Sequence, residues 1–379
     1  MHELVQVAKY YPPYFGGIPN YVQLLSEELK KNHRVTVLTS NTDFSRCEDV
    51  DGNLRVIRVP RIMELRSTAL CATLPWELGR IHADIIHLHF PDPMAHLAYV
   101  WGGRSSKLVI TWHSDIVRQR FLLAPYSSFL RRIVNRADRI IVSSPVMREK
   151  SPWLGSAQDR CVVIPFGVDL AKFELTPKVR EKSVDARRRH GPALILFVGR
   201  LVYYKGLEYL LEAMQGIDGK LLVVGTGPLK SVHRRQVDQL GLGSKVEFLG
   251  EVSEEQLIAL LHACDLFVLP STERSETFGI VQLEAMACSK PVVCTNLPTG
   301  VPWVNQNERT GLVVPPRNAL ALQGAIQRLL KNPSLRQEFG EAARKRVESE
   351  FTNEVHAHRM LSVYESVLKG TVLSREVGA

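Results

Sequence analysis

The segment "ALILFVGRLVYYKGLEYLLEAM" (193–214) decides the fold class of this 379-residue chain. It begins with a short run of apolar residues that ends at a Gly-Arg turn, and a helical stretch follows. A buried strand followed by a helix is the repeating unit of a parallel α/β sheet. The same strand–helix alternation recurs on both sides of this segment.

The alternation forms two series. Strands are expected in the first series at 4–10, 34–40, 85–90, 107–113 and 139–144, and in the second at 193–200, 219–225, 245–250, 265–271, 291–296 and 311–316. The segment 50–60 indicates an inserted or antiparallel strand. We expect an α/β protein with two doubly wound Rossmann-like domains facing across a cleft, 1–170 and 190–352, joined by a polar linker at 171–189.

Composition indicates an ordinary globular protein that favours an acidic partner. Hydrophobic residues make up 45% of the chain and charged residues 23%, while the formal net charge is +9. The six cysteines form no C-x-x-C pair, the first residues show no signal-peptide pattern, and no apolar run is long enough to span a bilayer. We therefore expect a cytoplasmic protein whose contact with a membrane, if any, is peripheral.

The segment "RSETFGIVQLEAMACSKPVV" (274–293) sets two carboxylates around a glycine. Glu276 lies just before the expected start of a helix near Phe278, and Glu284 lies inside the helix among apolar neighbours. An ionised carboxylate there needs a hydrogen-bonding partner, such as a ribose diol, and Gly279 lets a ligand approach the backbone. Alternatively, Glu276 caps the helix and Glu284 is solvated.

Basic residues and glycines follow two other strands of the second series. Arg200 and Lys205 lie in "GRLVYYKG", directly after the strand 193–200, where both side chains can meet a pyrophosphate. Gly225 and Gly227 follow the next strand in "VVGTGP". The simpler readings are a surface basic pair and a tight turn.

Two features of the first series also suggest ligand contact. Gly16 and Gly17 separate a strand from a helix, so main-chain N–H groups there can reach a phosphate or an acceptor. His113, in "TWHSD", stands at a strand end. The alternatives are a plain strand-to-helix turn and a structural histidine.

The 274–293 segment resembles the E-x7-E signature of retaining GT-B glycosyltransferases, the group 1 or GT4-type family. The glycine turn, strand-end His, GR-x4-KG, G-x-G-P and E-x7-E elements occur in the family's order over nearly the whole chain. The resemblance implies a C-terminal helix at about 354–370 that packs on the first domain. It implies four catalytic residues: Glu276, Arg200, Lys205 and His113. It implies donor-binding roles for Gly16, Gly17, Gly225, Gly227, Val252, Phe278, Gly279, Ile280 and Glu284.

The expected activity is retaining transfer of a hexose from a nucleoside-diphosphate sugar, with no metal or other cofactor. GDP-mannose is the favoured donor, and the acceptor would be a lipid-linked or oligosaccharide chain in bacterial polysaccharide or lipopolysaccharide assembly. The alternatives are a UDP-hexose-dependent transferase, a UDP-sugar epimerase of the same fold and a non-catalytic nucleotide-sugar-binding protein.

Other signals favour less specific interpretations. The D-x-D sequence at 49–51 follows no apolar strand, so we expect a loop there rather than a metal site. His87 and His89 share a strand face, but no third metal ligand is evident. No nucleic-acid-binding signature occurs. The basic and apolar segment 117–139 is consistent with a surface helix that packs on the sheet and has a solvated face. The more specific hypothesis is peripheral attachment to anionic lipid at the inner face of the plasma membrane.

Overall fold

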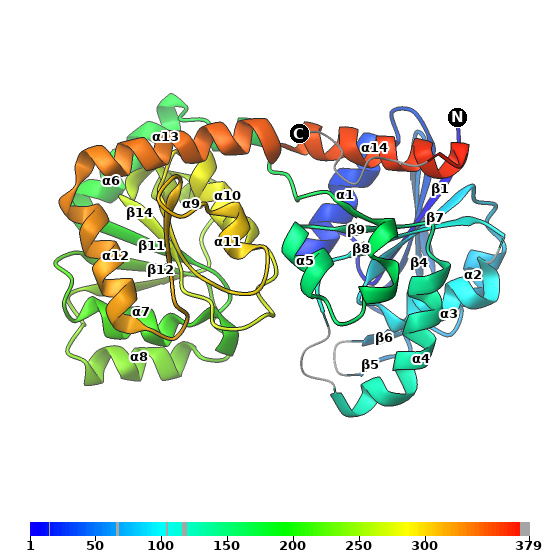
Figure 1. The fold of residues 1–379 in the computed structure, drawn as a ribbon, viewed down its shortest axis with the longest axis horizontal. Coiled ribbons are helices and arrows are strands. Elements are labelled where there is room, and N and C mark those ends of the chain that lie inside the picture. Colours follow the sequence, from blue (N-terminus) through cyan, green and yellow to red (C-terminus); the bar gives the residue numbers. More distant parts are fainter. Residues whose placement is uncertain (15, 66–67, 104, 116–119, 372–379) are drawn as a thin grey trace. The chain divides into compact units, whose positions relative to one another are not determined.

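The computed structural model describes residues 1–14, 16–65, 68–103, 105–115 and 120–371 and divides the chain into two compact units (Figure 1). Unit 1 contains Met1–Pro165 and the segment that begins at Asn353, and unit 2 contains Phe166–Thr352. Both units are α/β, and each is built on its own largely parallel sheet.

The sheet of unit 1 has eight strands in the order β10-β9-β8-β7-β1-β2-β4-β3. Its strands are β1 (Glu3–Ala8), β2 (Arg34–Ser40), β3 (Cys47–Asp51), β4 (Leu54–Val59), β7 (Ile85–Phe90), β8 (Lys107–Trp112), β9 (Arg139–Val142) and β10 (Cys161–Val163). Only β3 pairs antiparallel, and β5 (Met63–Leu65) forms a separate hairpin with β6 (Thr68–Leu70). The strand order reverses between β1 and β7.

The helices of unit 1 include one from the far end of the chain. They are α1 (Gly17–Leu29), α2 (Leu74–Gly79), α3 (Pro93–Gly102), α4 (Arg120–Arg136), α5 (Pro145–Lys150), the short 3-10 helix η1 (Gly155–Arg160) and the C-terminal α14 (Asn353–Lys369). Helix α14 contacts α1, which in turn lies on β1 and β2. Helix α14, at the position expected of the C-terminal helix, thus completes unit 1.

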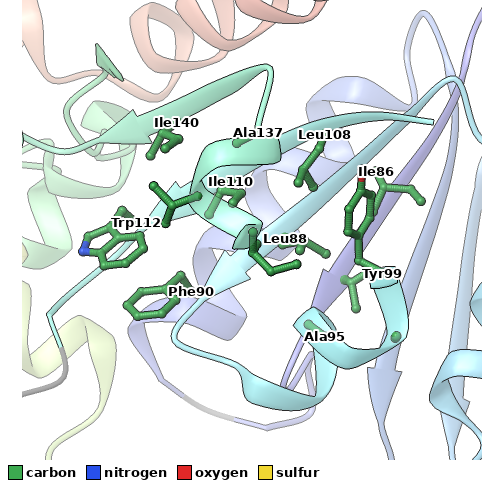
Figure 2. Packing of buried hydrophobic residues seen from close by; sticks show 14 of the residues in the cluster. Ile86, Leu88, Phe90, Ala95, Tyr99, Leu108, Ile110, Trp112, Ala137 and Ile140 are labelled. Carbon is green, nitrogen blue, oxygen red and sulfur yellow. The ribbon is translucent and has the colours of Figure 1, made fainter. Parts of the chain in front are cut away.

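Strand alternation separates the two faces of this sheet. Leu88, Phe90, Ile110 and Trp112 lie in one buried cluster with residues of α3 and α4, as Figure 2 shows for the strands and α3. The rings of Phe90 and Trp112 stack with centroids 3.6 Å apart. Since successive side chains of a strand point to opposite faces, His89 and Thr111, which lie between them, face the other side together with His87.

Unit 2 contains a six-stranded parallel sheet in the order β13-β12-β11-β14-β15-β16. Its strands are β11 (Leu194–Val198), β12 (Lys220–Val224), β13 (Val246–Gly250), β14 (Leu266–Leu269), β15 (Val292–Thr295) and β16 (Gly311–Val314). This is the Rossmann strand order, in which the chain reverses direction across the sheet between the first and fourth strands. Here that switch point lies between β11 and β14.

The helices of unit 2 connect these strands and continue beyond them. They are η2 (Leu170–Phe173), α6 (Pro177–His190), η3 (Tyr203–Lys205), α7 (Leu207–Met214), α8 (Lys230–Gln239), α9 (Glu254–Ala263), α10 (Ile280–Ala287), α11 (Val301–Val304), α12 (Ala319–Lys331) and α13 (Pro333–Glu350). The core on one side of the sheet includes Phe197 and Val223 from the strands and Leu210 and Ile326 from α7 and α12.

Two expectations from the sequence are wrong. The segment 171–189 is not a free linker, because most of it forms α6, which packs on α9 within unit 2. The D-x-D sequence is not a loop: Asp49 and Asp51 lie in β3, an exposed edge strand. Asp49 pairs with Arg58 and Asp51 with Lys30, so ion pairs occupy both carboxylates.

Candidate active site

The candidate site of unit 2 lies at the carboxyl ends of β11 and β14. Because the connections from these neighbouring strands run to opposite sides, their ends border a crevice, the usual ligand position in such sheets. The turn after β11 is residues 199–206, and the loop after β14 is residues 270–279. These segments contain the sequence-predicted Arg200, Lys205 and Glu276.

Gly206 allows these two segments to pack closely against each other. Gly206 has φ +64°, and a Cβ there would lie only 2.1 Å from the carbonyl oxygen of Pro270. The N–H of Thr272 donates to the carbonyl oxygen of Tyr204 across the same contact, at 2.8 Å. A side chain at 206 would force the segments apart, so the last glycine of the GR-x4-KG element serves packing.

Lys205 and Glu276 form a buried ion pair. Nζ of Lys205 lies 2.6 Å from Oε2 of Glu276, and about nine-tenths of each side chain is buried. The hydroxyl of Ser271 donates to the same carboxylate oxygen at 2.9 Å. Glu276 therefore does not cap α10, because its carboxylate serves Lys205 and Ser271. Sequence reasoning missed Ser271, although it lies only two residues after the end of β14.

Arg200 lies on the same turn as Lys205 and is exposed to solvent. Burial raises the pKa of the Tyr204 hydroxyl, Glu276 raises it further, and Lys205 and Arg200 oppose the rise. All three predicted charged residues thus lie within electrostatic range of one hydroxyl. Among the described residues, the Arg200 guanidinium has no hydrogen bond or ion pair, so it is available to an anion.

Glu284 lies one turn into α10 and is half-buried. Burial raises the pKa of its carboxyl to about 7, and Glu254 adds to the rise, while Lys172 and Lys205 oppose it. Within the described part of the chain, no hydrogen bond or ion pair satisfies this carboxyl group. Burying the ionised Glu284 carboxylate therefore costs free energy, and a ligand that donates hydrogen bonds to it would reduce that cost.

The residues before Glu284 place the start of α10. Gly279 is the N-cap with φ +71°, and a Cβ there would lie 2.6 Å from the Leu269 side chain. The ring of Phe278 is buried against Phe166 and Phe351, so only its backbone can meet a ligand. Ile280, half-buried, is the first residue of the helix.

The glycines after β12 bring a second turn against the first. A Cβ at Gly225 would lie 2.2 Å from the carbonyl oxygen of Gly199, and one at Gly227 would lie 2.4 Å from that of Leu201. These glycines therefore let the two turns pack, and their predicted contact with the nucleotide stays a prediction. The same holds for Val252, which is half-buried after β13.

Unit 1 carries the remaining predicted residues. Gly16 is the N-cap of α1 and Gly17 its first residue; both are exposed, and a Cβ at Gly17 would meet no atom within 4 Å. His113 follows β8 and is buried. Its Nε2 lies 3.1 Å from Nδ1 of His89, and burial lowers the pKa of its imidazole to about 3.

His87 and His89 also make side-chain hydrogen bonds. Nδ1 of His87 lies 2.6 Å from the Tyr364 hydroxyl and its Nε2 lies 2.7 Å from the Thr111 hydroxyl. Nε2 of His89 lies 2.7 Å from Oε1 of Gln6. Hydrogen bonds therefore occupy both ring nitrogens of His87 and of His89, which leaves neither ring a nitrogen for a metal.

The predicted lipid-binding segment 117–139 corresponds mainly to α4; residues 117–119 and the side chains of 120–125 lie outside the described residues. In the described half, Leu130, Ile133 and Val134 are buried in the core, while Arg131 and Arg132 are exposed. That half presents charge to solvent and keeps these apolar side chains inside the unit. No helix in the described part of the chain combines the length and apolar character needed to span a bilayer.

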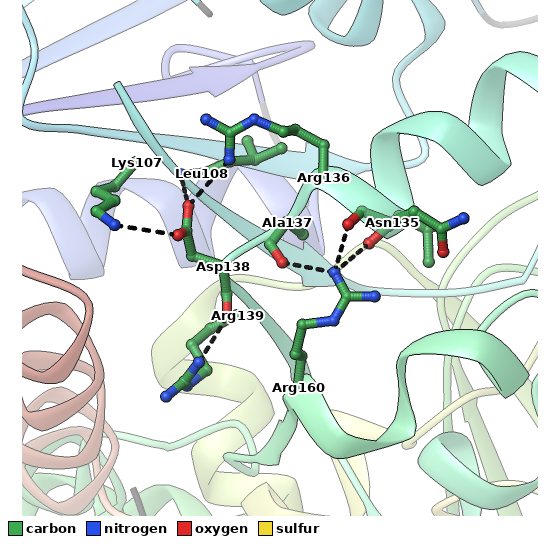
Figure 3. A network of polar contacts seen from close by, with 9 residues as sticks. Lys107, Leu108, Asn135, Arg136, Ala137, Asp138, Arg139 and Arg160 are labelled. Atoms are coloured by element: carbon green, nitrogen blue, oxygen red, sulfur yellow. Dashed lines mark hydrogen bonds and ion pairs between the residues drawn. The ribbon is translucent and has the colours of Figure 1, made fainter. Parts of the chain in front are cut away.

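A polar network fixes the end of α4 (Figure 3). The guanidinium of Arg160 donates to the backbone oxygens of Val134, Asn135 and Ala137. Asp138 accepts from the N–H of Leu108 at 2.8 Å and pairs with Lys107. A cation on the last carbonyls of a helix stabilises its C-terminus. These contacts attach α4 firmly to the sheet.

Comparisons with known proteins agree with this arrangement. A family model of group 1 glycosyl transferases matches residues 179–346, and one of glycosyltransferase family 4 matches residues 15–172. The chain is 34% identical to D-rhamnosyltransferase WbpZ from Pseudomonas aeruginosa, over 92% of each protein. It is 32% identical to O-antigen chain mannosyltransferase C from Escherichia coli, over 95% of this chain and 97% of that one.

A solved structure shares the whole architecture. Sucrose-phosphate synthase from Thermosynechococcus elongatus superposes with a TM-score of 0.79 at 27% identity, covering 98% of this chain and 100% of that one. The structural neighbours are GT-B glycosyltransferases, so the two Rossmann-like units have the expected GT-B fold. Since the family models together match most of the chain and both of these relatives align over nearly its whole length, this protein belongs to the group 1 and family 4 glycosyltransferases.

Proposed function

We propose that this protein transfers mannose, or a sugar of the same ring configuration, from a nucleoside diphosphate to a growing polysaccharide, with retention at the anomeric carbon. The two relatives are named for mannose and D-rhamnose, and D-rhamnose is mannose without the hydroxyl at C6. One is named for O-antigen chains, which supports a bacterial surface polysaccharide as the product. GDP-mannose is the donor that we favour.

The contact between Lys205 and Glu276 carries the proposal. It joins a cation that could bind phosphate to a carboxylate that could bind hydroxyls, at the switch point of the sheet. A donor bound there would present its diphosphate to Lys205 and Arg200 and its sugar to Glu276. Backbone N–H groups at the start of α10 would complete the phosphate site, since a helix N-terminus favours negative charge.

Glu284 would hold the ribose of the nucleotide. Its carboxyl has a pKa of about 7 because burial disfavours the charge, and two ribose hydroxyls would supply the missing donors. Hydrogen bonds to the ionised form lower a carboxyl pKa, so we infer that nucleotide binding at neutral pH releases a proton. The main-chain turns at Gly16, Gly225 and Val252 would make further donor contacts.

Transfer would proceed by attack on the same face of the sugar that the diphosphate leaves. The bond from the anomeric carbon to the phosphate oxygen breaks and a bond to the acceptor oxygen forms. The acceptor proton passes to the departing phosphate. Arg200 and Lys205 would stabilise charge that develops on the diphosphate, and Glu276 and His113 would hold hydroxyls of the reacting sugars. The proposal requires no metal and no cofactor.

A lipid-linked acceptor would bring the protein to the inner face of the membrane. The exposed Arg131 and Arg132 on α4 support electrostatic contact with anionic lipid. The buried apolar side of the described half of α4 argues for adhesion by charge rather than by insertion.

A ligand screen tests the proposal. Thermal unfolding would be followed with GDP-mannose, GDP-D-rhamnose, UDP-glucose, UDP-galactose and UDP-N-acetylglucosamine, because a ligand that binds only the native state raises the melting temperature. We expect the largest rise with GDP-mannose. A rise confined to UDP-sugars would replace the donor, and conversion of a sugar without an acceptor would indicate an epimerase. Binding without turnover for every acceptor would indicate a non-catalytic protein.

The stereochemistry needs its own measurement. A nucleophilic carboxylate would need a second carboxyl group about 5 Å from it. Glu276, however, already bonds Lys205 and Ser271, which suits it to bind hydroxyls. We expect proton NMR of the isolated product to show the same anomeric configuration as the donor. An inverted product would contradict same-face attack.

A further inference from the structure

A chain of buried polar side chains connects His113 to the backbone of unit 1. It runs through residues of α1, three neighbouring strands and α14, and all of its side chains are buried. Its members, in order of contact, are Pro165, His356, Tyr21, Thr111, His87, Tyr364, Gln6, His89 and His113. The sequence pattern explains its position, because Gln6, His87 and His89 alternate with apolar residues that face the opposite side of the sheet.

At the Pro165 end of this chain of side chains, the donor and acceptor of each hydrogen bond can be assigned. Nδ1 of His356 lies 2.7 Å from the carbonyl oxygen of Pro165, which can only accept, so Nδ1 carries the proton. Burial lowers the pKa of His356 to about 4, so the ring is neutral at pH 7 and Nε2 is an acceptor. The hydroxyl of Tyr21, at 3.1 Å, therefore donates to Nε2 of His356.

This assignment in turn determines the donors and acceptors among the strand residues. Thr111 lowers the pKa of the Tyr21 hydroxyl, and Tyr21 has already donated its one proton, so the Thr111 hydroxyl is the donor in their contact. Thr111 in turn must accept from Nε2 of His87, at 2.7 Å. Burial lowers the pKa of His87 to about 3, so this ring is also neutral and its Nδ1 is an acceptor.

Tyr364 of α14 lies between His87 and Gln6, and its hydroxyl determines how the Gln6 amide is oriented. Nδ1 of His87 accepts from the Tyr364 hydroxyl at 2.6 Å, so the Tyr364 oxygen must accept from the amide nitrogen of Gln6 at 3.0 Å. This orientation leaves Oε1 of Gln6 to accept from Nε2 of His89 at 2.7 Å. Burial holds the pKa of His89 well below its usual value, so its Nδ1 is unprotonated.

We propose that this chain holds His113 as the tautomer protonated at Nε2, which makes Gln6, His89 and Tyr364 positioning residues for His113. Nε2 of His113 donates to Nδ1 of His89 at 3.1 Å, and Nδ1 of His113 can then only accept. A substrate hydroxyl that contacts Nδ1 must donate its proton to it. This inference rests on the proposed function for the role of His113, but the tautomer itself can be measured without a substrate.

The matched variants are Tyr364→Phe and Tyr99→Phe. Tyr364→Phe removes the hydroxyl between His87 and Gln6, so the Gln6 amide can turn over. Its NH2 group then donates to Nε2 of His89, and His89 carries its proton on Nδ1. Tyr99→Phe removes another buried hydroxyl of unit 1, one without a hydrogen-bond partner in the described structure. Thr111→Val breaks the chain at a second point, and Thr111→Ser keeps the hydroxyl.

The experiment is NMR of the full-length protein labelled with 15N in its histidine rings, with His113 assigned by its loss in His113→Asn. We expect Nε2–H at His113 in the wild type, in Tyr99→Phe and in Thr111→Ser. We expect a mixture of tautomers in Tyr364→Phe and Thr111→Val, with a fall in kcat of roughly tenfold and a smaller change in KM. Correct folding would be confirmed by the remaining histidine signals.

The outcomes separate the two proposals. A wild-type His113 protonated at Nδ1, or an unchanged tautomer in both folded variants that break the chain, would overturn the inference. If the tautomer responds as expected while His113→Asn transfers sugar at the wild-type rate, the inference about the tautomer is supported and the proposed role of His113 in transfer is wrong.

Discussion

Nζ of Lys205 lies 2.6 Å from Oε2 of Glu276, although the two residues follow different strands, and both side chains are about nine-tenths buried. Without a donor sugar, the two charges that we assign to different parts of the substrate neutralise each other. The pair therefore has a structural role in addition to its proposed catalytic one. Loss of stability on substitution is consequently no argument against catalysis at this site.

A double-mutant cycle separates these roles. Lys205→Met and Glu276→Gln should each lower the free energy of unfolding by about 2–4 kcal/mol, because each leaves a buried partner without its counter-charge. The double variant should lose less than the sum, since it leaves no buried charge, yet all three should transfer sugar at least about 100-fold more slowly. Denaturant unfolding and initial rates measure the two effects. Additive stability losses would contradict the coupling.

Arg200 provides a simpler case, because it is exposed. Arg200→Ala should change stability by less than about 0.5 kcal/mol while reducing kcat about 100-fold, if its guanidinium stabilises the departing diphosphate. Arg200→Lys should be intermediate, since an ammonium keeps the charge and loses the fork. Arg235→Ala, at another exposed arginine of unit 2, is the control. Unaltered turnover in Arg200→Ala would remove Arg200 from the diphosphate site.

Glu284 should make stability depend on pH in a defined direction. Its folded-state pKa is about 7, above the ordinary value of 4.5, so the folded state binds the proton more tightly than the unfolded state. The associated stability is present below pH 4.5 and is lost as the pH rises to 7, an effect of up to about 3 kcal/mol. Glu284→Gln should therefore stabilise the ligand-free protein at pH 8 and hardly change it at pH 4.5.

The same substitution should weaken nucleotide binding, because the amide has lost the carboxylate that accepts from the ribose. Melting temperatures at pH 4.5 and 8 and calorimetric affinities for the nucleotide measure both effects. Glu338→Gln, at an exposed position on α13, is the control. Equal stabilisation at both pH values would show that the charge of Glu284 is not the cause.

The sequence predicted the fold because a buried strand appears as a run of apolar residues that are adjacent in the sequence, so it can be recognised without knowledge of tertiary contacts. All six strands of unit 2 occur where apolar runs indicated them. Helix α6 was misassigned because Val179 is its single buried residue, so it lacks an apolar stripe. Strand β3 was missed for the same reason: all five of its residues are exposed. Pattern reasoning finds elements that bury a face and misses those that do not.

The site was predictable in position but not in its contacts. Lys205 and Glu276 each follow a strand of the switch point, and the rule for parallel sheets brings such positions together. That they pair with each other depends on tertiary packing of the two segments. His113 was identified by its strand-end position, whereas Tyr364, near the other end of the chain, joins its network only through the docking of α14.

Gly17 offers a test of ligand approach in unit 1. A Cβ there would meet no atom within 4 Å and Gly17 is exposed, so Gly17→Leu should leave the melting temperature nearly unchanged. If substrate approaches the start of α1, the added side chain should block it and reduce kcat/KM at least tenfold. Gly155→Leu, also in unit 1 with no atom within 4 Å of its Cβ, is the matched control. Full activity in Gly17→Leu would exclude close approach of substrate at this turn.

The exposed arginines of α4 should govern adhesion to anionic lipid. Arg131 and Arg132 are exposed while the apolar residues beside them are buried, so binding should depend on charge. Each arginine near such a surface contributes about 1 kcal/mol, so Arg131→Gln with Arg132→Gln should weaken partitioning about 30-fold. Arg188→Gln with Arg189→Gln, an exposed adjacent pair on α6, is the control. Flotation with anionic and neutral vesicles at low and high salt measures the effect, and equal binding to both kinds of vesicle would contradict an electrostatic contact.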